Sequence, residues 1–180
     1  MAQHYCEAAI GDPLHGPYHD REYGFPIDND NGFFGRLVLE INQAGLSWAT
    51  ILKKKDNFTA AYDGFDIATV AAYDEAARAR LLADAGIIRN RLKVNAAIVN
   101  AGRLLEIRAT DGSFKAWLDN HHPAELDRWI KQFRANFKFT GPEIVREFLV
   151  STGYLPGAHR PECPVYTVIE GLNPPWMQAQ

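Results

Sequence analysis

The feature that most constrains this chain is a helical segment whose apolar face carries a carboxylate. Phe33, Leu37 and Ala44 recur at helical spacing around Glu40, so the four side chains share one face of a helix. Such a face packs against other helices in the protein interior. Glu40 therefore either points into a buried surface, where a carboxylate serves a function, or bends out to water at the rim, as charged side chains usually do.

A helix junction follows this segment directly. Gly45 is typical of a helix C-terminus, Ser47 is typical of an N-cap, and the next helix begins at Trp48. The junction brings the carboxylate of Glu40 close to an indole. On the residue pattern alone, Trp48 is either a core tryptophan or one wall of a binding site.

Helical periodicity dominates the rest of the chain, and no series of alternating apolar and polar residues predicts strands. Residues 1–30 are rich in helix breakers, and the proline-rich tail from Tyr154 has no helical pattern. Because the expected helices are short and numerous, we predict an all-α fold with orthogonal packing rather than a parallel bundle. The expected helices cover residues 30–44, 48–62, 67–73, 75–84, 93–108, 114–119, 125–136 and 142–151. Asp30, Asp66 and Asp74 are the expected caps of the first, third and fourth of these helices.

Length and composition are those of an ordinary globular domain. Of 180 residues, 47% are hydrophobic and 23% charged, and we expect a single domain over residues 1–180. No apolar run could span a bilayer and no signal peptide is evident, so we expect a cytoplasmic protein without a membrane partner. The net charge of −3 excludes a broadly basic surface, so any binding of nucleic acid must depend on a local patch.

Cysteines and histidines near the two ends of the chain form a candidate metal site. Cys6 and His19 lie in the N-terminal segment, and His159 and Cys163 form a His-x3-Cys pair near the C-terminus. Two cysteines and two histidines are a ligand set of closed, structural zinc sites. The alternative is a plain buried Cys163 and a surface His159, because the sequence has no Cys-x2-Cys pair. A disulfide is not expected in a reducing compartment.

A tight connection at residues 137–141 is a candidate site for a nucleic-acid backbone. A turn that leads into a helix N-terminus exposes backbone N–H groups, which bind phosphate oxygens. The alternative is a pair of ordinary helix–helix turns with solvated basic residues. The basic residues that could form one face are Lys131, Arg134, Lys138 and Arg146 around this turn, and Arg89, Arg91 and Lys93 at a second turn.

The helix junction could also form part of a pocket. A carboxylate at Glu40 and an indole at Trp48, with Tyr18 and Tyr23 in the N-terminal segment, suit a flat cationic ring. Stacking on the indole and a facing negative charge favour such a ligand over its neutral analogue.

Five sequence blocks together resemble the 3-methyladenine DNA glycosylase I family. The resemblance runs in order from about Cys6 to Cys163, and Gln-Ala-Gly-Leu-Ser-Trp is its most specific block. The blocks are Tyr18-His19-Asp20-x-Glu22-Tyr23-Gly24, Leu39-Glu40-x-x-Gln43-Ala44-Gly45-Leu46-Ser47-Trp48, Leu52-Lys53-Lys54-Lys55, Asp84-Ala85-Gly86-Ile87-Ile88-Arg89 and Phe137-Lys138-Phe139-x-Gly141.

The resemblance implies a helix-hairpin-helix DNA glycosylase fold, in which residues 137–153 supply the hairpin and its second helix. It also implies roles for residues at both ends of the chain. The implied DNA-backbone contacts are Lys138, Phe139, Thr140 and Gly141, and the implied ligands of one structural Zn²⁺ are Cys6, His19, His159 and Cys163.

The resemblance further implies a base pocket. Glu40 matches the carboxylate that hydrogen-bonds the damaged base, Trp48 matches the stacking indole, and Tyr18 matches a pocket wall. Tyr23 stands where the family often has tryptophan. Glu7 and Ala8 follow the first cysteine where many members have Gly-Trp, so one aromatic wall is either lost or supplied from elsewhere.

The expected activity is hydrolysis of the N-glycosidic bond of 3-methyladenine flipped out of alkylated double-stranded DNA, with free 3-methyladenine as the product. Glu40 is the expected catalytic group, because it favours a cationic leaving base over neutral adenine, and water completes the hydrolysis. Residues 154–159 contain no carboxylate, and no lysine suits a lyase step. We expect a monofunctional, monomeric enzyme. The alternative is a non-catalytic, zinc-containing sensor of alkylated DNA.

Overall fold

The protein is built from helices over the part of the chain that the structure describes. The computed structural model describes residues 4–178, and the absence of any strand within that range confirms the all-α prediction. The elements are α1 (Tyr5–Ala9), α2 (Gly16–Arg21), α3 (Asp30–Gln43), α4 (Trp48–Ala61), η1 (Asp63–Phe65), α5 (Ile67–Ala71), α6 (Glu75–Ala83), α7 (Arg91–Asp111), α8 (Phe114–His121), α9 (Leu126–Asn136), α10 (Pro142–Ser151), α11 (Pro164–Leu172) and α12 (Pro175–Gln178).

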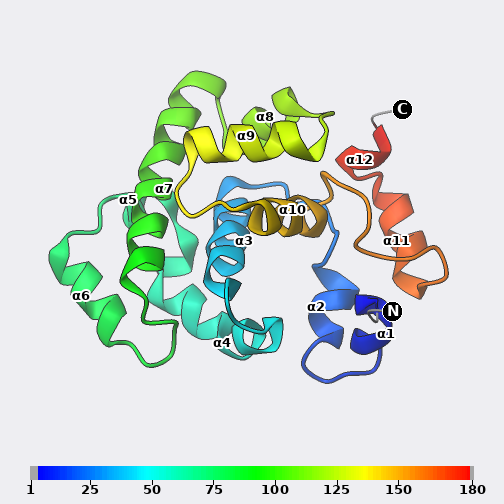
Figure 1. The fold of residues 1–180 in the computed structure, drawn as a ribbon, viewed down its shortest axis with the longest axis horizontal. Helices are drawn as coiled ribbons and strands as arrows, with labels where there is room; N and C mark the ends of the chain where they lie inside the picture. Colours follow the sequence, from blue (N-terminus) through cyan, green and yellow to red (C-terminus); the bar gives the residue numbers. More distant parts are fainter. Residues whose placement is uncertain (1–3, 179–180) are drawn as a thin grey trace.

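Helix α3 is the central element of the fold. It packs against α4, α7, α8 and α10, and Figure 1 shows it in the middle of the molecule beside α10. Its apolar face is buried as predicted, with Phe33 and Leu37 almost fully enclosed. Because α3 has neighbours on several sides, a polar group on that face ends up inside the protein.

Short polar side chains set the helix starts in the middle of the chain. Ser47, Asp66 and Asp74 each accept a hydrogen bond from a backbone N–H in the first turn of the helix that follows, as the sequence predicted. For α3 the cap is Asn29 rather than Asp30, and Asp30 instead pairs with Arg108 of α7. These caps fix where α3, α4, α5 and α6 begin.

An aromatic cluster fills the space between α3, α8, α9 and α10. The rings of Phe33 and Phe114 lie 5.9 Å apart in an edge-to-face arrangement, and Phe148 stacks on Phe114 at 6.1 Å. Phe133 and Trp129 extend the cluster into α9. This packing holds α10 against α3, which positions the site described below.

Both ends of the chain are more helical than the sequence analysis predicted. Residues 1–30 were expected to be loop-rich and the tail irregular, yet the structure has α1 and α2 at one end and α11 and α12 at the other. Pro17, Pro164 and Pro175 lie in the first turns of their helices. Proline is tolerated there because the first-turn N–H groups have no partner within the helix.

The two ends meet on one side of the molecule. Figure 1 shows α1 and α2 close to α11, and a small apolar cluster joins Cys6 to Cys163, Val165 and Ile169. Within residues 4–178, no helix is both long and apolar enough to cross a membrane. The termini therefore pack on each other in a cluster separate from the main core.

Candidate active site

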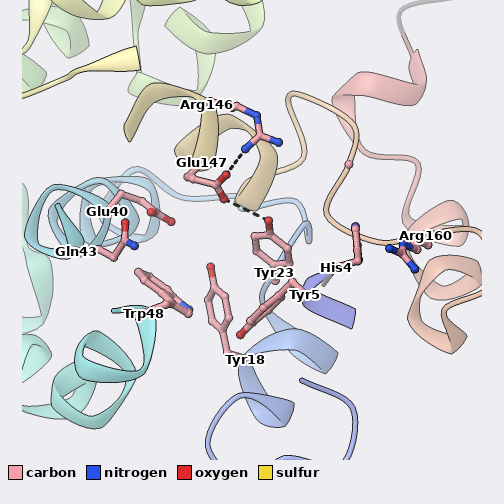
Figure 2. A pocket seen from close by; sticks show the side chains of 11 residues that line it. His4, Tyr5, Tyr18, Tyr23, Glu40, Gln43, Trp48, Arg146, Glu147 and Arg160 are labelled. Atoms are coloured by element: carbon pink, nitrogen blue, oxygen red, sulfur yellow. Dashed lines mark hydrogen bonds and ion pairs between the residues drawn. The ribbon is translucent and has the colours of Figure 1, made fainter. Parts of the chain in front are cut away.

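A cavity of about 530 Å³ lies between the N-terminal helices, α3, the start of α4 and α10 (Figure 2). The loop before α11 contributes Gly157 and Arg160 to its lining. Its lining contains four aromatic side chains and two carboxylates. The lining residues are His4, Tyr5, Tyr18, Tyr23, Glu40, Gln43, Trp48, Arg146, Glu147, Gly157 and Arg160.

Glu40 forms part of this cavity and is only 4% exposed. The alternative in which it bends out to water is therefore wrong. Burial raises the pKa of Glu40 from its ordinary value of 4.5 to about 8, partly offset by Arg36 and reinforced by the negative charge of Glu147. Arg36 itself donates to the Tyr18 hydroxyl and the Ser151 carbonyl, both at 3.1 Å. Glu40 thus faces the cavity as an almost completely desolvated carboxyl group.

Aromatic rings form the wall opposite Glu40. Trp48 packs on Tyr18 with ring centroids 5.1 Å apart, and Tyr18 lies 5.7 Å from Tyr23. The indole Nε1 of Trp48 is buried and has no hydrogen-bond partner among residues 4–178. The structure therefore brings together the four residues that the sequence analysis placed in the pocket.

Tyr5 is a pocket residue that the sequence analysis missed. Its ring lies 5.1 Å from that of Tyr23, edge to face, and its hydroxyl hydrogen-bonds to His15 Nδ1 at 3.0 Å. It is the residue before Cys6, whereas the expected aromatic would follow Cys6 at Ala8. An aromatic wall is thus supplied from the other side of the cysteine, and the aromatic residue directly before Cys6 was the available signal.

Glu147 and Arg146 of α10 also line the cavity, although the sequence analysis gave Glu147 no role. The Tyr23 hydroxyl donates to Glu147 Oε2 at 3.3 Å, and Arg146 pairs with Oε1 of the same carboxylate. Nothing in the local sequence identifies Glu147, because its approach to the pocket depends on how α10 packs against α3.

The four predicted metal ligands come together in the structure. Cys6, His19, His159 and Cys163 are buried, and their candidate ligand atoms all lie within 4.8 Å of one another. Cys163 Sγ lies 3.6 Å from both His19 Nε2 and His159 Nδ1, and Cys6 Sγ lies 3.8 Å from His159 Nδ1. Tetrahedral zinc at its usual bond lengths separates ligand atoms by roughly 3.3–3.8 Å, so the residues fit such an ion.

Hydrogen bonds orient both histidines of this cluster. His19 Nδ1 lies 2.7 Å from Asp20 Oδ1, and His159 Nε2 lies 2.7 Å from the Tyr23 carbonyl oxygen. Each contact leaves the other ring nitrogen facing the cysteine sulfurs, as in sites where a second partner fixes the tautomer of a metal-binding histidine. The bond to Tyr23 also joins the cluster to the pocket wall.

The connection at residues 137–141 forms a tight turn before α10. Phe139 adopts a left-handed conformation with φ of 61°, and Gly141 is the residue that precedes α10. The side chain of Thr140 is buried and donates to the Phe137 carbonyl, while the backbone N–H of Lys138 donates to Asn100 Oδ1 at 2.7 Å. These internal bonds fix the shape of the turn, and contact with DNA remains a prediction.

Lys93 does not belong to an exposed basic face. It is 5% exposed, and its ammonium donates to the carbonyl oxygens of Asn42 and Ala44 at 2.8 and 2.7 Å. These are free carbonyls at the C-terminal end of α3, and a lysine satisfies them well. The placement of Lys93 among phosphate-binding residues was wrong, because burial against α3 was not visible in the sequence.

Comparison with known proteins identifies the family. The family model for methyladenine glycosylases matches residues 8–132. The chain belongs to this family. DNA-3-methyladenine glycosylase 1 of Escherichia coli (strain K12) is 35% identical over 169 residues, covering 82% of this chain and 89% of that protein. DNA-3-methyladenine glycosylase of Haemophilus influenzae is 30% identical over 172 residues, covering 83% and 91%.

Solved structures of the family have the same fold. The 3-methyladenine DNA glycosylase I of Staphylococcus aureus, in a structure that addresses 3-methyladenine recognition, is 30% identical with a TM-score of 0.81 and covers 91% of this chain and 97% of its own. A 3-methyladenine DNA glycosylase I variant in complex with 3-methyladenine is 30% identical with a TM-score of 0.80, covering 89% and 96%. The family assignment thus rests on both sequence and fold.

Proposed function

We propose that this protein is a DNA-3-methyladenine glycosylase of base-excision repair, which hydrolyses the N-glycosidic bond of 3-methyladenine flipped out of alkylated double-stranded DNA. The observation that carries the proposal is the cavity in which a buried Glu40 faces Trp48 and Tyr18. Family membership supports the same activity. The products are free 3-methyladenine and an abasic site.

In this mechanism, the positive charge of the alkylated base distinguishes it from neutral adenine. Because burial raises the pKa of Glu40 to about 8, the empty pocket avoids an isolated buried anion at neutral pH. A cationic nucleotide that enters the pocket favours the ionised carboxylate, whereas neutral adenine does not. The rings of Trp48 and Tyr18 hold the base flat, and this combination excludes undamaged adenine.

Cleavage of this glycosidic bond needs little chemical assistance from the enzyme. A methyl group on N3 makes adenine a good leaving group, so extruding and holding the base contribute most of the catalysis. Water then attacks C1′ of the sugar. The Glu40 carboxylate stabilises the base as it departs, and we propose no lysine-dependent lyase step.

The surrounding elements hold the DNA and the pocket wall. We propose that residues 137–153 act as a helix-hairpin-helix element, whose turn at Lys138, Phe139, Thr140 and Gly141 binds the DNA backbone, helped by the exposed Arg91. Cys6, His19, His159 and Cys163 would hold one Zn²⁺ that ties the two ends of the chain together. Four protein ligands leave no open position, so this metal is structural.

The direct test is release of free base. The protein is incubated with methylated duplex DNA, and released bases are separated by chromatography. We expect 3-methyladenine to appear in amounts that increase with enzyme and time. Binding to methylated DNA without any released base would identify a non-catalytic sensor and contradict the proposal.

A further inference from the structure

The cavity contains a second carboxylate, which the proposed recognition of the base does not use. Glu147 comes from α10 and Glu40 from α3, so two helices that pack against each other each contribute one acid. Figure 2 shows both carboxylates along the edge of the cavity that faces the rings of Tyr18 and Trp48. Each of two nearby carboxylates disfavours the ionised form of the other, so a second acid in one small pocket calls for a role of its own.

The two carboxylates lie in different surroundings. Glu40 is 4% exposed, whereas the side chain of Glu147 is 33% exposed and its neighbour Arg146 is 48% exposed. Exposure therefore increases from Glu40 through Glu147 to the rim of the cavity. A base that reached Glu40 would have its glycosidic bond and sugar on the side of the rim, where the more exposed Glu147 lies. Pairs of acids in unlike surroundings are typical of enzymes that divide two catalytic roles between them.

Glu147 is held in place and can still accept hydrogen bonds from a water molecule. The Tyr23 hydroxyl donates to Oε2, and Arg146 pairs with Oε1. Each carboxylate oxygen can accept about two hydrogen bonds, so both retain a free acceptor position. Because Glu147 is partly exposed, water can reach these positions from the rim.

Resting on the proposed function, we infer that Glu147 is a second catalytic residue, which receives a proton from the water that attacks C1′ of the sugar. The bond between C1′ and N9 breaks, and its electron pair neutralises the cationic base. A water oxygen bonds to C1′, and the water proton passes to the Glu147 carboxylate and then to solvent. The negative charge of Glu147 also stabilises the positive charge that develops on the sugar.

The variant Glu147→Gln separates this role from a structural one. Glutamine keeps an oxygen that accepts from the Tyr23 hydroxyl, so the pocket wall stays in place while the proton acceptor is lost. The matched control is Glu170→Gln on α11, where the exposed glutamate has no side-chain partner among residues 4–178 and does not line the cavity. Two quantities are measured: the single-turnover rate of 3-methyladenine release and the affinity for free 3-methyladenine.

We expect Glu147→Gln to lower the single-turnover rate at least tenfold, on the scale of general base catalysis, with the affinity for free 3-methyladenine changed less than twofold. Glu170→Gln should leave both quantities unchanged. A smaller loss of rate, or a loss of affinity that matches the loss of rate, would overturn the inference. Failure of the wild-type protein to release the base would instead contradict the proposed function, so the two failures are distinguishable.

Discussion

At the scale of single residues, Glu40 determines what the pocket can do. Its carboxyl group is enclosed between Arg36 of its own helix, Glu147 of α10 and the tyrosines Tyr18 and Tyr23 of the N-terminal segment. Burial dominates these influences and raises the pKa of Glu40 to about 8. The folded protein therefore retains a proton that the unfolded chain releases above about pH 4.5.

Because of this retained proton, the stability of the protein should depend on pH. Since the folded state binds more protons than the unfolded state between about pH 4.5 and 8, stability falls as the pH rises through that range. Glu40→Gln removes the titration. Between pH 5 and 8 the wild type should lose roughly 2–4 kcal/mol of stability that Glu40→Gln keeps, as measured by urea denaturation. A difference that stays constant with pH would contradict the buried carboxyl.

Individual residues were predictable where the signal is local. The helical spacing around Glu40 predicts that it lies on the apolar face, although it left open whether the carboxylate is buried or bends out to water. The junction through Ser47 predicts that Trp48 lies near it. Tyr5 and Glu147 were missed, because each joins the pocket through contacts between segments far apart in the sequence. Local patterns contain no information about such contacts.

At the scale of elements, the helices with a polar N-cap were predictable, and so was α10, which begins with Pro142. The proline-containing helices at the two ends of the chain were not. Asp66 and Asp74 mark helix starts in the sequence and in the structure. The proline-rich tail from Tyr154 was expected to be irregular, yet Pro164 occupies the first turn of α11, since proline suits that position as well as it suits a loop. Only packing of α11 against the N-terminal segment distinguishes the two outcomes.

At Gly24 the N-terminal segment lies directly against the segment that precedes α11. Its φ is +80°, and an added Cβ would lie 2.5 Å from the Cβ of Ala158. Gly11 has a similar φ of +77° but open space around it, so it is a matched control. Left-handed strain should lower the free energy of unfolding of both alanine variants by about 1–2 kcal/mol. The clash with Ala158 should lower that of Gly24→Ala by about 1–3 kcal/mol more. Equal losses on thermal unfolding would contradict the close approach.

Lys93 should stabilise the end of α3 without binding DNA. Lys93→Met keeps the apolar contacts but removes the two hydrogen bonds to carbonyl oxygens, so we expect a loss of about 1–3 kcal/mol in the free energy of unfolding. The salt dependence of DNA binding should not change. In the control, Arg91→Met on the same helix, we expect the opposite pattern, with unchanged stability and a weaker salt dependence. A change in the salt dependence of DNA binding by Lys93→Met would show that Lys93 belongs to the DNA-binding face.

At the scale of the whole molecule, the Cys/His cluster links the N-terminal and C-terminal segments to the pocket. His159 donates to the Tyr23 carbonyl, and Tyr23 in turn donates to Glu147, so the cluster, the wall and the second carboxylate form one connected series. Residue types alone left a plain buried Cys163 open, and the family resemblance predicted that these four residues come together, as they do in the structure. The hydrogen bonds that orient both histidines were not predictable, because they depend on how the ends fold together.

The purified protein should contain one zinc ion per chain. Chelation or Cys163→Ser should lower the melting temperature and expose both ends to proteolysis, because apolar packing there is limited to a small cluster. Elemental analysis and limited proteolysis measure these effects. A metal-free protein whose melting temperature is unaffected by chelation would show that the four residues are simply buried.

The most direct test of the account is the affinity of the pocket for free 3-methyladenine. Titration calorimetry compares the wild-type protein with Glu40→Gln at neutral pH. The account predicts measurable binding by the wild type and at least tenfold weaker binding by the variant, because the carboxyl group that meets the base is lost. Equal affinities in the two proteins would contradict the assigned role of Glu40.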